Sequence, residues 1–473
     1  MSSDRQAGTG YRIKALSEDI REAISGSDRD FTEAALGKAI LLLAVPSVLE
    51  MIMESVFVIA DMFFVSKLGA DAVATVGLTE SLLTISYAIS LGLATATTSL
   101  VSRRIGEKNP EKAAETAFQA ILTGIVVSFV ISVPSVIYSQ KLLAAMGASR
   151  EIISQFSGYT RIMMGGNLVI MLLFINNAIF RSAGDAAIAM RVLWVGNIIN
   201  IVLDPCFIFG LGPFPELGVK GAAIATTTGR GISVLYQLWL LYFGNKRIQL
   251  SFSQMKIKLK VIAKLVRLSF GSIGQNLIAT TSWIALVRII SIFGSEVVAG
   301  YTIAIRIINF ALLPSWGISN AASTLVGQNL GAGKPDRAEK AVLVTGWINM
   351  IFLGTIGLIL VLFPGFFIYI FIHDDIVLKS GIECLRILSI GFIAYGFGMV
   401  LVNSFNGAGD TETPLRINIF AYWLLEIPLA WLLAIKSGMN EEGVYTAILI
   451  AESVMTIIAW LVFRRGRWKL KVV

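Results

Sequence analysis

The chain has 473 residues, of which 55% are hydrophobic and only 15% are charged, and its mean hydropathy is +0.75. These values exclude an ordinary soluble domain, and recurring apolar windows of about 20 residues predict an all-α polytopic membrane protein. The net charge of +8 does not indicate nucleic-acid binding, because the basic residues cluster between and after the apolar stretches.

Residues 1–36 are polar and charged, and we expect them to form a cytoplasmic N-terminal segment. Leu16, Ile20 and Ile24 recur at four-residue spacing within it. This pattern predicts a short amphipathic helix on the membrane surface, with a partly disordered tail as the alternative.

The rest of the chain predicts twelve membrane-spanning helices. We place them at 39–67, 73–102, 115–137, 153–180, 186–211, 218–243, 265–293, 297–327, 338–363, 379–404, 414–435 and 443–463. Alternate connections are rich in Lys and Arg, namely 103–112, 244–264, 328–340 and the tail 464–473. This asymmetry predicts that both termini are cytoplasmic, and the basic tail is expected to touch anionic lipid headgroups.

The two halves of the chain are similar to each other. One constant offset, which we call the repeat offset, pairs Gly69 with Gly294 and 183–185 (AGD) with 408–410 (AGD). Six helices per half give both halves the same orientation, so the sequence predicts two six-helix lobes related by a parallel repeat. We assign 37–243 to the N-lobe (helices 1–6), 244–264 to a cytoplasmic linker, 265–463 to the C-lobe (helices 7–12) and 464–473 to a basic cytoplasmic tail. Two such bundles are expected to enclose a cleft and to rock for alternating access.

The first span carries three acids on one stripe, Glu50, Glu54 and Asp61, after a proline at position 46. An ionised carboxylate at the bilayer centre costs about 2.5–3.5 kcal/mol, so the stripe should face the protein interior or a hydrated cavity. Asp61 is the strongest candidate, while Glu50 and Glu54 are accessory acids, and Glu50 could simply be hydrated near the cytoplasmic end. Pro46 is either a fixed kink or a hinge.

The fifth span brings Asn197, Asn200 and Asp204 onto one helix face. Asp204 and Asp61, with an amide oxygen and a threonine hydroxyl, would form the hard oxygen set that suits a small cation. The same two desolvated carboxylates could hold protons instead. For Asn197, a contact between helices is favoured over a functional role.

The acids of the first half have no counterparts in the second, which favours chemistry in the first bundle. The repeat offset matches these residues with Gln275, Ala279, Leu286 and Leu429. We expect the substrate cleft to be lined by residues of both halves, namely Asn197, Met53, Met163, Gln275 and Arg306. Arg230 and Arg306 lie near mid-span, and a buried arginine should find an acid across the cleft.

No catalytic residues are expected, so the chain is not predicted to be an enzyme. It has one histidine, His373, in a predicted loop, and two cysteines, Cys206 and Cys384. No Ser/His/Asp or Cys/His set is evident.

Several motifs together resemble the multidrug and toxic compound extrusion (MATE) family of antiporters, in particular its prokaryotic members. The resemblance covers nearly the whole chain, about residues 37–463. Its most specific parts are ADMFFVSKLG (60–69), SLVSRRIGEKNPEKA (99–113), FRSAGD (180–185), NIINIVLDPCFIFGLG (197–212), GVKGAAIATT (218–227), TLVGQNLGAGKPDRA (324–338) and NGAGD (406–410).

The resemblance implies two six-helix lobes and export of amphipathic, often cationic drugs driven by inward Na⁺ or H⁺. It implies a coupling site of Asp61, Asn200, Asp204 and Thr226, which would hold Na⁺ in a sodium-coupled member, with Thr227 as the alternative to Thr226. Tyr159 and Pro46 fall at matching positions, the latter where the first helix bends. Another branch uses second-lobe carboxylates, whose absence at 279 and 286 favours N-lobe coupling here.

The sequence therefore predicts a secondary active multidrug exporter in the cytoplasmic (inner) membrane. No cofactor is expected beyond the transported Na⁺ or H⁺. The expected partners are small-molecule drugs or toxins and the lipid bilayer, without nucleic acid, and the protein is expected to be monomeric. The alternative is a flippase for lipid-linked oligosaccharides, which needs a basic cleft such as Arg230, Arg288 and Arg306 could provide.

Overall fold

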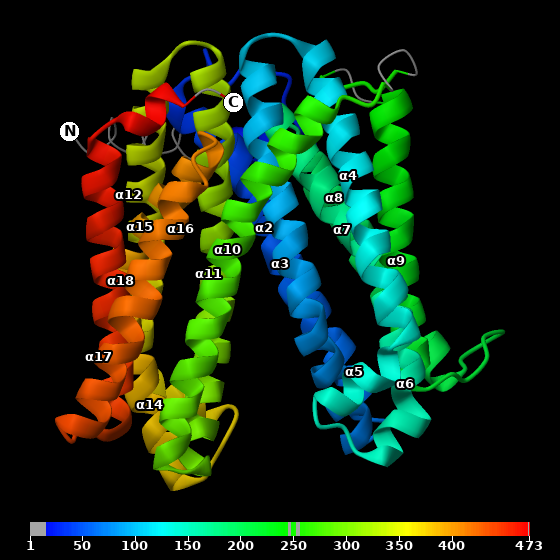
Figure 1. Ribbon diagram of the computed structural model, residues 1–473, viewed down its shortest axis with the longest axis vertical. Helices are drawn as coiled ribbons and strands as arrows, with labels where there is room; N and C mark the ends of the chain where they lie inside the picture. Colours follow the sequence, from blue (N-terminus) through cyan, green and yellow to red (C-terminus); the bar gives the residue numbers. More distant parts are fainter. Residues whose placement is uncertain (1–15, 245–246, 252–255, 472) are drawn as a thin grey trace, which may run out of the picture. The chain divides into compact units, whose positions relative to one another are not determined.

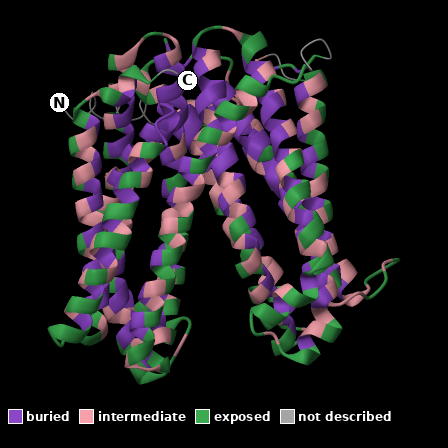
Figure 2. Cartoon of the chain, viewed as in Figure 1, coloured by how far each residue is buried: buried purple, intermediate pink, exposed green. Residues whose placement is uncertain are grey.

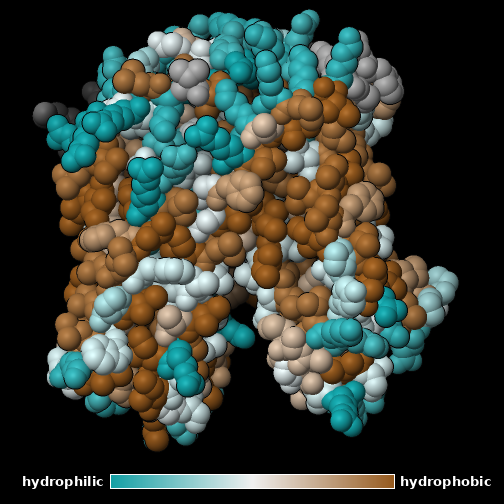
Figure 3. Space-filling view, viewed as in Figure 1, coloured by the Kyte–Doolittle hydropathy of each residue, from teal (hydrophilic) through white to brown (hydrophobic). Residues whose placement is uncertain are grey.

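The computed structural model describes residues 16–244, 247–251, 256–471 and 473, and the regular structure within these residues is entirely helical. Residues 1–15 of the predicted N-terminal segment lie outside this range, as do six residues of the predicted linker and Val472 of the tail. On the face shown in Figure 3, hydrophobic residues cover the middle of the long helices and hydrophilic residues gather toward their ends. This banding is what a bilayer requires of a helical protein.

The first half of the chain contains the helices that are blue to green in Figure 1. They are α2 (Leu36–Ser66), α3 (Ala70–Gly106), α4 (Pro110–Ile137), α5 (Ser139–Ala145), α6 (Arg150–Gly165), α7 (Asn167–Ala183), α8 (Ala186–Phe209), α9 (Val219–Trp239) and the π-helical η1 (Leu240–Gly244).

The second half runs from green to red in Figure 1. It contains α10 (Leu259–Ile290), η3 (Ser291–Phe293), α11 (Ser295–Gly331), α12 (Pro335–Leu362), α13 (Pro364–Tyr369), α14 (Asp375–Ile390), α15 (Phe392–Gly407), α16 (Glu412–Asn418), η4 (Ile419–Glu426), α17 (Ile427–Trp431), η5 (Leu432–Lys436), α18 (Asn440–Arg464) and η6 (Arg467–Leu470).

These helices cover all twelve predicted spans. Within the described residues, ten are long and apolar enough to cross a membrane, or eleven if α14 and α15, which are bent by 55° to each other, form one span. The remaining range, α9, is not among them. It carries Lys220 and Arg230, which lower its hydropathy, and it packs mainly on α8.

The duplication predicted from the sequence is confirmed by the helix boundaries. Helices α3 and α11 both have 37 residues, α4 and α12 both have 28, and α6 and α14 both have 16, and the starts of each pair are related by the repeat offset. Gly69 and Gly294 precede α3 and α11 with φ of 100° and 114°. Only glycine adopts this conformation readily, so the turn itself was duplicated with the helices.

The chain divides into two compact units. Unit 1 comprises Met1–Arg29 and Leu49–Ser269, and unit 2 comprises Asp30–Val48 and Phe270–Val473. The N-terminal part of α2 therefore packs with unit 2, although the predicted N-lobe began at residue 37. A Cβ added at Gly317 of α11 would lie 2.8 Å from the Ser47 oxygen, so glycine allows this close packing.

Within each unit, the helices turn buried faces inward and exposed faces outward, as Figure 2 shows. The core is formed by aliphatic and aromatic clusters. One cluster of unit 2 joins α10, α11, α14 and α18 around the stacked rings of Tyr301 and Tyr445, and one cluster of unit 1 surrounds Tyr159 and Met163.

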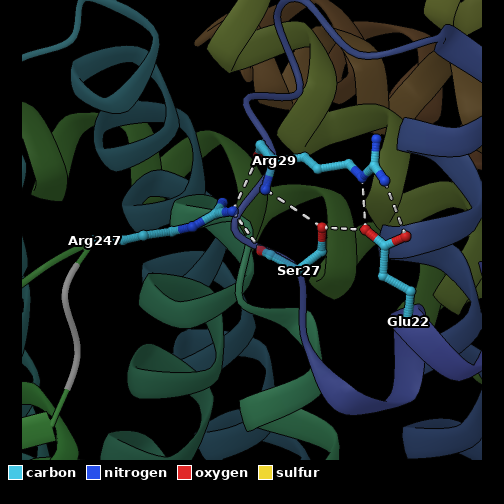
Figure 4. A network of polar contacts seen from close by, with 4 residues as sticks. All are labelled: Glu22, Ser27, Arg29 and Arg247. Carbon is cyan, nitrogen blue, oxygen red and sulfur yellow. Dashed lines mark hydrogen bonds and ion pairs between the residues drawn. The ribbon is translucent and has the colours of Figure 1, made fainter.

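The described part of the N-terminal segment is ordered by basic side chains. Residues 16–25 are helical and leave Leu16, Ile20 and Ile24 exposed, as the amphipathic pattern predicted. Figure 4 shows Arg247 donating to the carbonyl oxygens of Ser27 and Arg29, while Arg29 pairs with Glu22. Arg247 also donates to the Ala183 oxygen, so the connection after η1 holds this segment against α7.

The basic tail packs on unit 2. Trp468 is buried and stacks on Phe463 at 4.8 Å between ring centroids. The Lys469 ammonium donates to Glu339, and hydrogen bonding to this carboxylate raises the pKa of Lys469. Lys471 pairs with Asp410 at 3.1 Å. These two lysines are thus paired with acids of the same unit, while contact of the tail with lipid headgroups stays a prediction.

Candidate functional site

Helix α2 presents its three acids to three different environments. Glu50 is almost fully buried and accepts hydrogen bonds from Arg181 on α7, at 2.8 Å to Oε1 and 3.0 Å to Oε2. Asn177, one turn earlier on α7, donates to the same Oε1 at 3.0 Å. Glu50 is therefore a neutralised structural acid between α2 and α7 rather than a hydrated group.

Glu54, one turn further along α2, is held by Arg230 of α9. Arg230 Nη2 donates to Glu54 Oε1 at 3.0 Å, and Asn197 Nδ2 donates to Oε2 at 3.2 Å. The guanidinium also contacts the Tyr87 hydroxyl at 3.3 Å and lies 5.0 Å from the centre of the Phe57 ring. The partner of Arg230 is thus an acid of its own unit. The expectation of an acid across the cleft was wrong, because Glu54 lies within reach.

Asp61 lies two turns beyond Glu54 and has no such partner. It forms no ion pair among the described residues, and its Oδ1 is buried without a hydrogen bond from any of them. Arg230 acts on it electrostatically, as does the carboxylate of Glu80 on α3, which the sequence analysis did not single out.

Asp204 on α8 is fully buried and close enough to Asp61 for the two charges to repel each other. Asn200 Nδ2 donates to Asp204 Oδ1 at 3.3 Å and to the Thr226 hydroxyl at 3.1 Å. Asp204 Oδ2 and Asn200 Oδ1 are buried and receive no hydrogen bond from the part of the chain that the structure describes. Together with Asp61 Oδ1, the polar groups of Asp61, Asn200 and Asp204 thus include three orphaned oxygens.

Two glycines bring Asn200 and Thr226 together. A Cβ at Gly229 of α9 would lie 2.6 Å from the Gly196 oxygen of α8 and 3.1 Å from the Asn200 Cβ. A Cβ at Gly196 would lie 2.0 Å from the Ser233 hydroxyl. Because neither position has room for a side chain, the backbones of α8 and α9 approach closely, and the polar groups of both helices meet.

Tyr159 of α6 is also near this site. It is buried in the cluster with Met163 and feels the charges of both Asp61 and Asp204. Thus four of the five predicted coupling residues, Asp61, Asn200, Asp204 and Thr226, are linked by hydrogen bonds or electrostatic interaction, and Tyr159 adjoins them.

These oxygens have the chemistry to bind a small hard cation or protons. Carboxylate, amide and hydroxyl oxygens are suitable ligands for Na⁺-like cations. Buried oxygens that receive no hydrogen bond are stabilised by a cation or a proton. No cluster of three or more His, Cys, Asp or Glu residues suited to a metal ion occurs in the described chain. The arrangement therefore offers two acids with neutral oxygen donors, rather than a transition-metal centre.

A small pocket adjoins the site between α6, α7 and α9. Its lining residues are Met163, Gly166, Val169, Ile170, Thr226, Thr227 and Arg230. Thr226 thus turns to both Asn200 and the pocket, whereas Thr227 belongs to the pocket lining.

Asn197 and Gln275, also predicted for the cleft, make contacts within their own units. Met53 is buried on α2, and Asn197 is bonded to Glu54, which favours its role as a helix contact. Gln275 of unit 2 donates to Asn406 Oδ1 at 3.1 Å and to the Thr411 oxygen at 3.0 Å. Arg306 is exposed on α11, so it is not the buried arginine that was expected.

Pro46 lies inside α2, which continues as a helix on both sides of it. The change from unit 2 to unit 1 falls between Val48 and Leu49, within one turn after the proline. A proline removes one backbone hydrogen bond of the helix. The backbone hydrogen bonding of α2 is therefore weakened next to the boundary between the two units.

Known proteins are similar to this chain over both of its halves. The sequence profile of the MatE family matches residues 46–206 and 272–432, once in each half of the chain. The "Probable multidrug resistance protein NorM" of Thermotoga maritima is 25% identical over 441 residues, which cover 92% of this chain and 94% of that protein. The "FAD transporter" of Shewanella oneidensis is 25% identical over 432 residues, which cover 91% and 95%.

Solved structures show the same architecture. A MOP superfamily transporter from Pyrococcus furiosus superimposes with a TM-score of 0.87 at 26% identity, covering 93% of this chain and 98% of the other. The all-α membrane fold with a repeated half, expected from the sequence, is therefore confirmed.

Proposed function

This chain belongs to the MatE family of multidrug transporters, and we propose that it is a secondary active exporter. It would couple the efflux of amphipathic, often cationic compounds to the inward movement of H⁺ or Na⁺. The observation that carries this proposal is the contrast among the buried and partly buried acids of unit 1. Glu50 and Glu54 have arginine partners, while Asp61 and Asp204 have none in the described chain and keep orphaned oxygens.

In this proposal the coupling ion binds at Asp61 and Asp204. Two desolvated carboxylates that repel each other gain most from a positive partner. Asn200 and Thr226 would supply neutral oxygens to Na⁺, and Tyr159 would border the same site. The ion is cargo, so no resident cofactor is proposed.

Neutralisation of the aspartates is proposed to drive the change of conformation. Once a cation or proton has neutralised the two aspartates, their carboxylates no longer need to be hydrated. The helix α2 can then bend at Pro46. The lobes 37–243 and 265–463 would then alternate between inward and outward access. Drug and ion affect each other's affinity by the same factor, because binding linkage is reciprocal.

The pocket beside Thr226 supports a place for substrate in unit 1. Met163 provides an adaptable apolar surface, and Thr227 and Arg230 provide polar groups. Both termini are proposed to lie in the cytoplasm, with the chain as a monomer in the inner membrane, in keeping with the basic loops.

The alternative function, a flippase for lipid-linked oligosaccharides, needs free basic groups for a pyrophosphate. The pairing of Arg230 with Glu54 argues against it, because this buried cation of unit 1 is already neutralised.

The proposal is tested in proteoliposomes with a fluorescent cation as substrate. Efflux is driven separately by a Na⁺ gradient and by a pH gradient, and FAD export is measured in parallel. We expect one of the two gradients to drive efflux of the cation by the wild-type protein. The Asp204→Asn variant should fall to the rate of empty vesicles.

Glu216→Gln is the matched control, because Glu216 is an exposed acid of the same unit. It should retain the wild-type rate. Full gradient-driven efflux by the Asp204→Asn protein would overturn the proposed coupling site, and export of FAD without the cation would overturn the proposed substrate class.

A further inference from the structure

Unit 2 contains a second pair of acids, the buried Glu426 and the partly buried Glu452. Glu426 ends the π-helical segment η4 and is only 4% exposed. Ser282 of α10 donates its hydroxyl to Glu426 Oε2 at 2.6 Å. This hydroxyl also lies 3.3 Å from the Tyr422 carbonyl oxygen, so α10 and η4 meet at this acid.

Glu452 comes from α18 and faces the same segment. The Tyr422 hydroxyl, one turn before Glu426 on η4, donates to Glu452 Oε1 at 3.2 Å. Glu452 Oε2 is buried and has no hydrogen-bond partner among the residues that the structure describes. The two carboxylates are close enough for their charges to repel each other.

The titratable groups described around this pair are all acidic. Tyr301 on α11, Tyr395 on α15 and Tyr422 on η4 feel the charge of Glu426, and the last two also feel that of Glu452. Neither glutamate forms an ion pair within the part of the chain that the structure describes. Unit 1 is different, since Glu50 and Glu54 each have an arginine.

The repeat adds an independent observation. The repeat offset places Glu426 at the position of Ile201 and Glu452 at that of Thr227. These positions directly follow Asn200 and Thr226 of the coupling site. The fifth and sixth helices of each half therefore carry the buried polar groups at nearly the same depth, with different side chains.

We propose that the acid pair Glu426 and Glu452 takes up one proton and forms a proton site of the protein, in unit 2. Two ionised carboxylates buried in a membrane without a cation are too costly to persist. When one of them takes up a proton, the pair carries a single charge, and the repulsion between them disappears. The Oε2 oxygen of Glu452 carries the proton, because no donor of the described chain points at it.

The donors favour a proton over Na⁺. Ser282 and Tyr422 direct their hydroxyl hydrogens at one oxygen of each carboxylate. A metal cation in the same place would require both hydroxyls to give up these bonds and turn their lone pairs toward it, and it would need further oxygen ligands.

Infrared difference spectroscopy of the purified full-length protein tests the proposal. The carbonyl stretch of a protonated carboxyl group is recorded from neutral to alkaline pH in the presence and absence of Na⁺. We expect the wild-type protein to show such a band at neutral pH, and Glu452→Gln to lose it. Glu442→Gln should keep the band, because Glu442 is exposed at the start of the same helix.

Two results would overturn the proposal. One is an unchanged set of protonated carboxyl bands in both Glu426→Gln and Glu452→Gln, which would mean that both acids are ionised. The other is loss, on adding Na⁺ at constant pH, of the band that Glu452→Gln removes, which would identify a metal cation site at this pair. Because the readout needs neither substrate nor vesicles, it remains decisive even if the proposed export activity fails its own test.

The transport consequence rests on the proposed function. If proton movement drives export, Glu452→Gln should lower the pH-driven rate about threefold to tenfold without abolishing it, while the Asp204→Asn variant abolishes it. A Glu452→Gln protein with the infrared change and a normal rate would show a proton site that does not take part in transport.

Discussion

The two halves have helices of matching length but differ in the partners of their acidic side chains. Helices α3 and α11 have the same length, and so do α4 and α12. In unit 1, Arg181 and Arg230 neutralise two glutamates, whereas Asp61 and Asp204 have no ion pair with the described residues. In unit 2, the described partners of Glu426 and Glu452 are hydroxyl donors. Duplication thus preserved the packing, while each half acquired its own ionisable groups.

This difference separates structural acids from functional ones. An acid with a buried arginine is already neutral as a pair, so it gains little from an external cation. An acid without one must obtain its positive partner from solution. Substitutions that remove each partner in turn should therefore give opposite patterns of stability and transport.

The largest effect on stability is expected at Glu50. Glu50→Gln leaves Arg181 with a neutral amide in place of a buried carboxylate, and breaking such a pair costs about 3–5 kcal/mol. Thermal unfolding in detergent should show a clear drop in the midpoint. Exchange of both residues, Glu50→Met with Arg181→Met, should recover most of the loss, and an undiminished midpoint in the single variant would contradict the structural role.

Removal of Glu54 should cost less, because part of its side chain is exposed. Glu54→Gln leaves the buried Arg230 with the Tyr87 hydroxyl, at an expected cost of about 2 kcal/mol. Ion-driven efflux should persist at a reduced rate. Complete loss of coupling with unchanged stability would instead make Glu54 a coupling acid and break the distinction drawn above.

A methyl group added between α8 and α9 should disturb the site although it removes none of the polar groups of the site. Gly229→Ala places a Cβ 2.6 Å from the Gly196 oxygen, and overpacking of this kind costs about 1–3 kcal/mol. The helices must separate, and Asn200 then loses contact with Thr226. Gly231→Ala is the control, because its added Cβ meets nothing within 4 Å. Equal ion affinity in the two variants would argue against the glycine contact.

The smallest effect is expected for a single hydroxyl. Thr226→Ala removes the partner of Asn200, and a hydrogen bond of about 1 kcal/mol corresponds to about a fivefold loss in ion affinity. Thr227→Ala should change drug affinity more than ion affinity, because Thr227 lines the pocket. If the two variants exchange these phenotypes, Thr227 is the ligand.

Much of this architecture follows from the sequence because membrane helices and repeats leave strong patterns. The twelve apolar ranges, the repeat offset and the cluster of Asn200 with Asp204 could all be read from spacing. The unit assignment of the first part of α2 could not, because it depends on the close packing that Gly317 permits.

The ion pairs were also beyond prediction. Arg230 was expected to reach across a cleft, but its partner is Glu54 of α2, an acid of the same unit. Arg181 was read only as part of the FRSAGD motif, although it neutralises Glu50. Glu452 was missed because no other acid lies near it in the last span of the sequence. Only the fold brings it close to Tyr422 and Glu426.

Drug and coupling ion are proposed to communicate through Asp61 and Asp204. The most direct measurement is the dissociation constant of a fluorescent cationic drug, determined across pH and Na⁺ concentration for the wild-type and Asp204→Asn proteins. The wild-type affinity should weaken as the coupling ion binds, and the affinity of the Asp204→Asn protein should be independent of that ion. An Asp204→Asn protein with the full wild-type dependence on pH or Na⁺ would contradict the account.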